Sequence, residues 1–406
     1  MAFWNRKKEV RADDSSSSAD ITKGYLAAII GNGVNEVTGS DMAMKISTVY
    51  RCVDILSKGI AQLPLIIKRN RGDWFEATDD DIFGLSYLLK VQPNERMTAY
   101  ELKRNAMIQV LLRGYAYILP LEGADSYERL VLLTPGSTVY DKYQNTYSVN
   151  DPVNHISGVF PADKVIHIRN LGLDGGYQGI STLSFAARVL AVSANADLYQ
   201  VETFKSGGVL TGFVSGKGTG TIGFGTVQDK QLEKVADDIQ GQLNSGKKIF
   251  NIPGEMSFNQ LSLSSTDMQL LASKEFNVAE ICRFFGVPLD KVFAGSGGNY
   301  KASEMSQVSF LTDTLAPYLE QIEQEFQIKL IPRDYYKDYR IDFDVEPLMQ
   351  TDLTTQADYI GKTIAAGART VNYWRKRLGQ APVKGGDAVL VSANLLELGS
   401  PKLRGE

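Results

Sequence analysis

The chain has 406 residues, of which 43% are hydrophobic and 22% are charged, and its formal net charge is −4. These values predict a folded protein of about two to four structural units. The acidic surplus argues against tight nucleic-acid binding by the single chain, because phosphate contacts come from Lys and Arg. DNA could still pass along such a surface without being bound tightly. Two cysteines are too few for a secreted disulfide framework, so an intracellular protein is expected. No apolar run reaches about 18 residues, so no membrane partner is expected.

The N-terminal part of the chain is predicted to change from disorder to helix. Residues 1–40 are charged and Ser-rich and lack an apolar segment, which predicts a disordered arm. The first strong helix is expected over 41–67, where apolar residues recur at helical spacing and Ser47 can cap the helix. A strand over 65–68 and a turn at 71–73 are expected next.

A second helix and a β-rich region follow. Thr98 has Glu101 three residues later, which is the capping-box pattern of a helix start, and Gly114 is a candidate for the helix end. Short apolar strands separated by turn residues are expected within 115–170, at 129–133, 139–143 and 165–168. The N-terminal part is therefore predicted to be a mixed α+β domain.

The cysteines and histidines give no catalytic or metal site. Cys52 and Cys282 each lie in an apolar helical pattern and are expected to be buried as small hydrophobic side chains. His155 and His167 lie in the β-rich region, and two scattered cysteines with two histidines do not form a zinc-binding pattern. The sequence therefore predicts no metal ion and no catalytic residue.

Three long amphipathic helices are predicted in the centre of the chain. The first covers 181–204, and at about 24 residues it would be on the order of 36 Å long. Its apolar stripe is rich in small residues that permit close helix packing: Leu183, Ala187, Leu190, Ala194, Leu198 and Val201. The second starts near Ser264 or Ser265 and ends before Pro288. The third covers 302–330 and follows a Gly-rich loop over 294–301.

Shorter elements surround these helices. Between the first two lies a small α/β insert, with strands expected at 208–214, 249–252 and 256–263 and a helix at 229–243. After the third, a strand is expected at 338–346 and helices at 352–366 and 370–378. The tail after residue 396 is polar and is expected to be loose.

Two Gly-rich segments raise the alternative of a nucleotide-binding enzyme. Residues 218–223 match G-x-G-x-x-G, but the insert of about 55 residues is too small for a doubly wound sheet. Residues 295–303 resemble a P-loop, but Tyr300 stands before Lys301 where that motif has Gly, and no apolar strand leads into the loop. We therefore expect no enzyme activity and no cofactor, and we interpret both segments as loops.

The order of the elements suggests a mechanical role. Two long helices separated by an insert can lie side by side and display the insert at one end. A helix with one apolar face and one polar face can form part of a channel wall that is buried on one side and exposed to solvent on the other. The central part of the chain is therefore interpreted as a wall segment of a channel, with another structural component of a virus particle as an alternative.

Several segments carry a resemblance to a known family. They lie in the same order as in that family, and most of them flank a predicted helix. They are Ile46-Ser47-Thr48-Val49-Tyr50-Arg51-Cys52-Val53 with Leu63-Pro64, then Gln92-Pro93-Asn94 with Thr98, Gly175-Gly176-Tyr177-Gln178-Gly179-Ile180-Ser181, Ile281-Cys282-Arg283-Phe284-Phe285-Gly286-Val287-Pro288, and Thr370-Val371-Asn372 with Gly385-Gly386-Asp387. Tyr373 departs from the pattern, since the family often has Glu there.

Through these segments the chain resembles the portal proteins of tailed bacteriophages, of the siphovirus type. The resemblance implies an α+β multidomain portal fold that assembles into a ring, usually of twelve copies. A disordered arm (1–40) would precede a wing formed by 41–180 and 306–350, the latter including a long helix. The stem would be 181–206 and 264–288, the clip 207–263, the tunnel loop 289–305 and the crown 351–396, before a loose tail (397–406).

The resemblance also implies partners and site residues. The ring would stand at a capsid vertex of the virion, after assembly in the host cytoplasm, and would conduct double-stranded DNA in packaging and ejection. Its other partners would be the large terminase, the head–tail connector, the major capsid protein and the scaffold protein. The DNA-facing tunnel loop would include Gly295, Ser296, Gly297, Gly298, Asn299, Tyr300 and Lys301, and docking at the clip would involve Lys217, Lys247 and Lys248.

Overall fold

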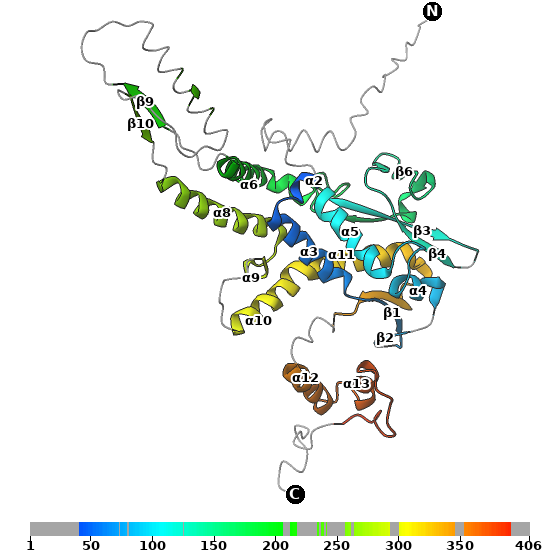
Figure 1. The fold of residues 1–406 in the computed structure, drawn as a ribbon. Coiled ribbons are helices and arrows are strands. Elements are labelled where there is room, and N and C mark those ends of the chain that lie inside the picture. Colours follow the sequence, from blue (N-terminus) through cyan, green and yellow to red (C-terminus); the bar gives the residue numbers. More distant parts are fainter. Residues whose placement is uncertain are drawn as a thin grey trace, which may run out of the picture. The chain divides into compact units, whose positions relative to one another are not determined.

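The computed structural model describes residues 40–390 apart from 73, 79–80, 125, 206–211, most of 217–255, 261–263, 293–299 and 346–352. The chain divides into two compact units (Figure 1). The first unit comprises Met1–Gln62 and Ile67–Ile341, and the second comprises Leu63–Ile66 and Asp342–Glu406. The expected arm (1–39 of it) and the expected tail lie outside the described residues.

The helix expected over 41–67 is two helices, α2 (Ser40–Ala43) and α3 (Ser47–Ala61). The expectation that Ser47 caps the helix is wrong, because Ile46 occupies the N-cap position and Ser47 is already helical. Ile46 is extended, with φ −78° and ψ 116°, and its side chain is buried, so packing of this residue interrupts the helical run. The expected apolar stripe of α3 is buried along its length.

Helix α5 (Ala99–Arg113) begins and ends as expected. The Thr98 hydroxyl accepts a hydrogen bond from the Glu101 backbone N–H, and the Glu101 carboxylate accepts one from the Thr98 backbone N–H, which completes a capping box. Gly114 follows in the left-handed conformation with φ 92°. A Cβ atom at Gly114 would lie 2.4 Å from the carbonyl oxygen of Gly179, so only glycine fits this turn.

Two three-stranded antiparallel sheets form the β-rich region. The first has the order β4-β3-β8, with β3 (Tyr115–Glu122), β4 (Tyr127–Leu132) and β8 (Ile166–Arg169). The second has the order β5-β6-β7, with β5 (Thr138–Asp141), β6 (Thr146–Asp151) and β7 (Ile156–Pro161). Apolar side chains from both sheets form a shared core of Tyr117, Leu119, Leu133, Tyr147, Val149 and Val165. Helix α5 packs on β3, and the expected mixed helix-and-sheet character is confirmed.

Short elements connect these parts. A third sheet has the order β11-β1-β2, with β1 (Leu65–Asn70), β2 (Phe75–Ala77) and β11 (Tyr339–Phe343). A 3₁₀ turn η1 (Ile82–Gly84) leads into α4 (Leu85–Lys90). Further 3₁₀ turns are η2 (Ala162–Lys164) and η4 (Arg333–Tyr335).

The first two long helices are present and pack against each other. They are α6 (Thr182–Lys205) and α8 (Ser264–Phe285), and Figure 1 shows them running alongside one another. Between them in sequence, β9 (Gly212–Gly216) pairs antiparallel with β10 (Met256–Gln260). The strand expected at 249–252 and most of the helix expected at 229–243 lie outside the described residues.

The third long helix is one helical run with a widened middle. It consists of α10 (Tyr300–Ser309), a π-helical segment η3 (Phe310–Leu315) and α11 (Ala316–Leu330). Pro317 has no N–H to donate to the carbonyl of Asp313, and the Ala316 N–H bonds back to the Leu311 carbonyl with π-helical spacing. The residue that widens the helix is thus visible in the sequence.

The second unit contains two helices, α12 (Leu353–Ala365) and α13 (Val371–Arg377). Trp374 is buried between them, where its ring meets Tyr359 edge-on and its Nε1–H donates to Thr363 Oγ1 at 3.0 Å. The Thr370 hydroxyl caps α13 by accepting from the Tyr373 N–H. A single aromatic side chain therefore joins the two helices.

Candidate functional site

The structure describes few of the expected site residues. Gly295, Ser296, Gly297, Gly298 and Asn299 lie outside the described residues, as do Lys217, Lys247 and Lys248. Tyr300 and Lys301 are the first residues of α10, so these two positions are helical rather than part of a loop. The structure therefore shows the two ends of the expected tunnel loop, which are α9 (Leu289–Val292) and α10.

The base of this loop is held by contacts on both sides. The Ser306 hydroxyl of α10 donates to Asp290 Oδ1 of α9 at 2.9 Å. The Lys291 ammonium lies 5.3 Å from the centre of the Phe310 ring, and Arg51 of α3 donates to the Lys291 carbonyl at 3.4 Å. These contacts hold α9 next to α10 and the π-helical segment that follows it.

The end of α8 is locked against the widened third helix. Gly286 adopts φ 67°, and the Val287 N–H bonds to the Cys282 carbonyl, which terminates α8. Thr314 Oγ1, within the π-helical segment, donates to the Gly286 carbonyl at 2.6 Å. A Cβ at Gly286 would lie only 3.2 Å from the Thr314 methyl group. The Phe-Gly-Val-Pro segment is thus a close-packed helix end.

The two cysteines meet where α3 packs on α8. Both are buried and free of disulfide bonds. A hydrogen bond to Cys282, together with burial, raises the pKa of the Cys52 thiol above its ordinary value. The expectation of buried thiols is confirmed, but the contact between them is not evident from sequence because 230 positions separate them. The buried thiol pair packs α3 against α8.

Helices α6 and α8 each leave apolar surface uncovered. On α6, Leu183, Ala187 and Leu190 are buried, but Leu198 and Val201, farther along the same stripe, are 60% and 48% exposed. On α8, Ile281 and Phe285 are buried, whereas Phe276 and Phe284 on the other side are 61% and 41% exposed. No described part of the chain fully covers these four side chains, and apolar surface of this kind is typical of an interaction surface.

The histidines do not form a site. His167 is buried, and its Nδ1 shares a hydrogen bond of 3.0 Å with the Tyr147 hydroxyl. Burial first, and then the charges of Arg169 and Lys329, lower the pKa of His167 to about 3, so the ring is neutral near pH 7. His155 lies in the turn between β6 and β7 with φ 57°. His167 is thus part of an aromatic core, where its ring centre lies 4.5 Å from that of Tyr117.

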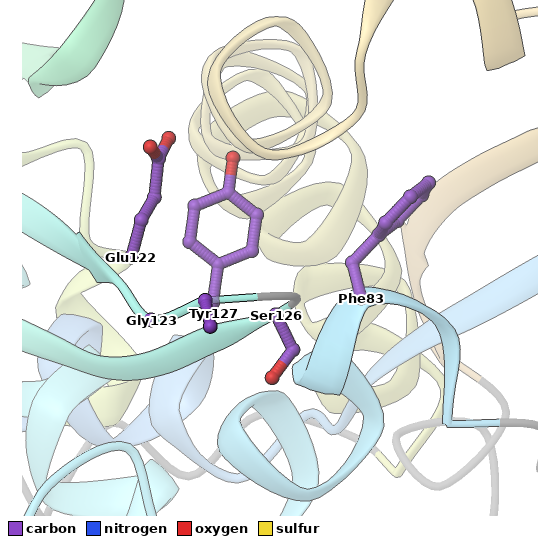
Figure 2. Close-up of a pocket in the computed structure, with 6 residues that line it drawn as sticks. Phe83, Glu122, Gly123, Ser126 and Tyr127 are labelled. Atoms are coloured by element: carbon purple, nitrogen blue, oxygen red, sulfur yellow. The ribbon is translucent and has the colours of Figure 1, made fainter.

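One pocket lies at the turn between β3 and β4, beside η1 (Figure 2). It has an empty volume of about 470 Å³ and is lined by Phe83, Glu122, Gly123, Ala124, Ser126 and Tyr127. The Tyr127 hydroxyl donates to the Lys329 carbonyl at 3.3 Å, and Glu122 forms an ion pair with Lys164. Its two largest polar side chains are thus already paired within the protein, and none of the residues singled out by the sequence lies in it.

The P-loop alternative lacks its structural context. Helix α9 precedes Tyr300 and Lys301, whereas a P-loop follows a strand. The G-x-G-x-x-G segment at 218–223 lies outside the described residues. Within the described part of the chain, no three His, Cys, Asp or Glu side chains are grouped as metal ligands. None of the described helices combines the length and the hydrophobicity of a membrane span.

Solved structures share the fold of this chain. A crystal structure of an HK97-family phage portal protein from Corynebacterium diphtheriae superposes with a TM-score of 0.57 at 13% identity, covering 78% of this chain and 98% of that one. A chain from the neck of a native gene transfer agent (GTA) particle, solved with C12 symmetry, gives a TM-score of 0.54 at 20% identity and covers 89% of this chain and 100% of its own.

Sequence comparison gives the family. The portal protein of Enterobacteria phage HK97 is 27% identical over 382 residues, which cover 88% of this chain and 85% of that protein. The family model for the phage portal protein matches residues 47–379, and this span includes all three long helices and α13. Because this match extends over most of the sequence, the chain belongs to the phage portal protein family.

Proposed function

We propose that the chain is the subunit of a ring-shaped portal at one vertex of a phage capsid, through which DNA is packaged and ejected. The observation that carries the proposal is the apolar surface of α6 and α8 that no described part of the subunit covers, in a member of the portal family. In a ring, each subunit offers such a surface to its neighbour through a heterologous interface that closes by rotation.

Twelve copies form the proposed ring. The GTA neck chain with the same fold was solved with C12 symmetry, which supports this number. A ring of identical subunits repeats one contact around its axis. A modest free energy at each contact therefore adds up to a stable closed ring. The proposed location is the virion, after assembly in the host cytoplasm.

The proposed parts of the ring follow the described helices. The stem (181–206 and 264–288) contains α6 and α8, and the wing (41–180 and 306–350) contains the three sheets with most of the third helix. The clip (207–263) contains the paired strands β9 and β10, and the crown (351–396) contains α12 and α13. Lys217, Lys247 and Lys248 in the clip are the proposed contacts for the large terminase and later for the head–tail connector.

The tunnel loop (289–305) is proposed to face DNA. The contact between Ser306 and Asp290 supports this role, because it holds α9 and α10, on the two sides of the Gly-rich segment, next to each other. Glycines allow the tip to meet a moving duplex without one fixed shape. Tyr300 and Lys301, at the start of α10, would give weak stacking and phosphate contact. We propose no catalytic role for the chain.

Electron microscopy of the purified chain tests the proposal. Negative-stain images should show closed rings with an axial hole, and a uniformly monomeric compact particle at all concentrations would refute it. The tunnel loop is tested by deleting Gly295 to Asn299, which should preserve rings but lower DNA packaging or retention. A matched variant in which these five residues become an equally long Gly-Ser stretch should package normally. Packaging by the deletion variant at the parental level would contradict the role of the loop.

A further inference from the structure

One segment of the second unit has a basic surplus, although the unit as a whole has eight basic and eight acidic residues and no net charge. Its described segment 353–390 contains six basic and two acidic residues, a net charge of +4, whereas the whole chain has −4. The basic residues are Lys362, Arg369, Arg375, Lys376, Arg377 and Lys384. A local basic surplus within an acidic protein is a sign of a polyanionic partner.

The basic residues near α13 stand on a rigid framework. Asn372 is buried, its Oδ1 accepts from the Val383 N–H at 2.8 Å, and its Nδ2 donates to the Val383 carbonyl at 3.0 Å. A Cβ on Gly386 would lie 2.4 Å from Asn372 Oδ1, so glycine is required there. Together with the Trp374 contacts, these bonds hold the segment around Lys384 beside α13.

Three of the cations lack a carboxylate partner among the described residues. Arg377 is neutralised by Asp344 at 2.8 Å, but Arg375 donates through Nε only to the carbonyl of Ala381, also at 2.8 Å. Lys376 and Lys384 are exposed, and no described carboxylate lies within ion-pair distance of either. A carbonyl is neutral, so its hydrogen bond does not compensate the positive charge of Arg375.

We propose that Arg375, Lys376 and Lys384 bind the phosphate backbone of double-stranded DNA without regard to sequence. The inference rests on the proposed function, which brings duplex DNA past every subunit. Planar guanidinium and flexible ammonium groups are the usual phosphate ligands, and few contacts per subunit keep the binding weak enough for DNA to slide. An acidic protein face is the competing partner, and the test below separates the two.

The test measures DNA binding by full-length rings as a function of salt. The probe is a fluorescent duplex of about 30 base pairs, followed by anisotropy between about 50 and 200 mM NaCl. The charge-reversal variant carries R375E, K376E and K384E. Each lost phosphate contact lowers the slope of log affinity against log salt by about 0.9, so one subunit's three contacts account for about 2.7.

A matched control carries the same change of charge elsewhere. It reverses three exposed basic residues of the first unit: Lys45, Arg333 and Lys337. We expect the control to keep the parental slope and affinity, and the α13 variant to lose at least about tenfold in affinity at about 50 mM salt. Equal losses in the two variants would show a general charge effect and overturn the inference.

Two further outcomes count against the DNA surface. Parental rings that fail to bind the duplex at low salt would overturn it while leaving the portal function intact. Displacement of the duplex by poly-L-glutamate at equal charge concentration would indicate an acidic protein partner instead. Negative-stain images of the same samples keep the two proposals apart, because loss of rings in the parental protein would refute the portal proposal itself.

Discussion

Replacing Phe276 and Phe284 of α8 with glutamine should weaken association between copies while leaving each copy folded. Phe276 is 61% exposed and Phe284 is 41% exposed, whereas Ile281 and Phe285 of the same helix are buried. Neither side chain belongs to the buried core, so their replacement should leave the described core of the subunit largely intact. Glutamine has good helix propensity, so α8 itself should be retained.

The expected magnitude follows from the exposed area. The exposed fractions of 61% and 41% together amount to about one whole phenylalanine side chain, or roughly 200 Å². At about 25 cal/mol per Å², covering this area in a neighbouring subunit contributes at most about 5 kcal/mol to each interface. Because ordering and desolvation offset part of this gain, we expect a loss of about 2 to 5 kcal/mol per interface, which is at least tenfold in the association constant.

Mass photometry over a dilution series, with thermal unfolding followed by circular dichroism, measures both effects. The double variant should dissociate at a concentration at least about tenfold higher than the parental protein, with an unchanged melting curve for the dissociated subunit. Tyr143→Gln is the matched control, because Tyr143 is an aromatic side chain, 89% exposed, at the turn between β5 and β6. Rings that persist in the double variant at the parental concentration would refute the interface at α8.

Three further predictions concern the stability of the first unit. Thr98→Ala removes the capping hydroxyl of α5 and should lower the free energy of unfolding by about 0.5 to 2 kcal/mol in urea titrations. Gly114→Ala should cost about 3 kcal/mol or more because its Cβ meets the Gly179 backbone, whereas Gly136→Ala, also at positive φ but with nothing within 4 Å, should cost about 1 to 2 kcal/mol. Burial lowers the pKa of His167 to about 3, so its neutral ring contributes stability that is full above about pH 6.5 and is lost as the pH falls toward 3. His167→Gln should therefore flatten the acid side of the stability profile by about 1.4 kcal/mol per pH unit below pH 6.5, and an unchanged profile would contradict this explanation.

Much of the local structure is predictable from the sequence because it depends on local chemistry. The capping box at Thr98, the glycine end of α5 and the periodic stripes of the three long helices are found where the residues place them. The interruption at Ile46 is different, since Ile46 is a buried apolar residue without a capping side chain and nothing in its type marks a helix start. The π-helical segment could have been predicted from Pro317, because a proline inside a helical pattern removes one hydrogen bond.

The contacts of the candidate site depend on tertiary packing and are not predictable from spacing. The Cys52–Cys282 contact, the Thr314 bond to Gly286 and the Ser306 bond to Asp290 each join residues from different elements. The family segments contain Cys52, Cys282 and Gly286, but sequence alone does not show which residues these three meet. The Asn372 contacts with Val383 now give a physical reason for the spacing of the C-terminal segment.

The α6 stripe shows why sequence periodicity alone does not identify an interface. Leu190 and Leu198 lie two turns apart on one stripe and have the same chemistry, yet the first is buried in the subunit and the second is 60% exposed. The periodicity indicates only that the whole stripe is apolar and suited to contact with an apolar partner. The described fold covers the first half of the stripe, whereas no described residue fully covers Leu198, and exposed apolar surface of this kind is suited to contact with another polypeptide. Membership of the portal family supports the proposal that a neighbouring copy in a ring provides this cover.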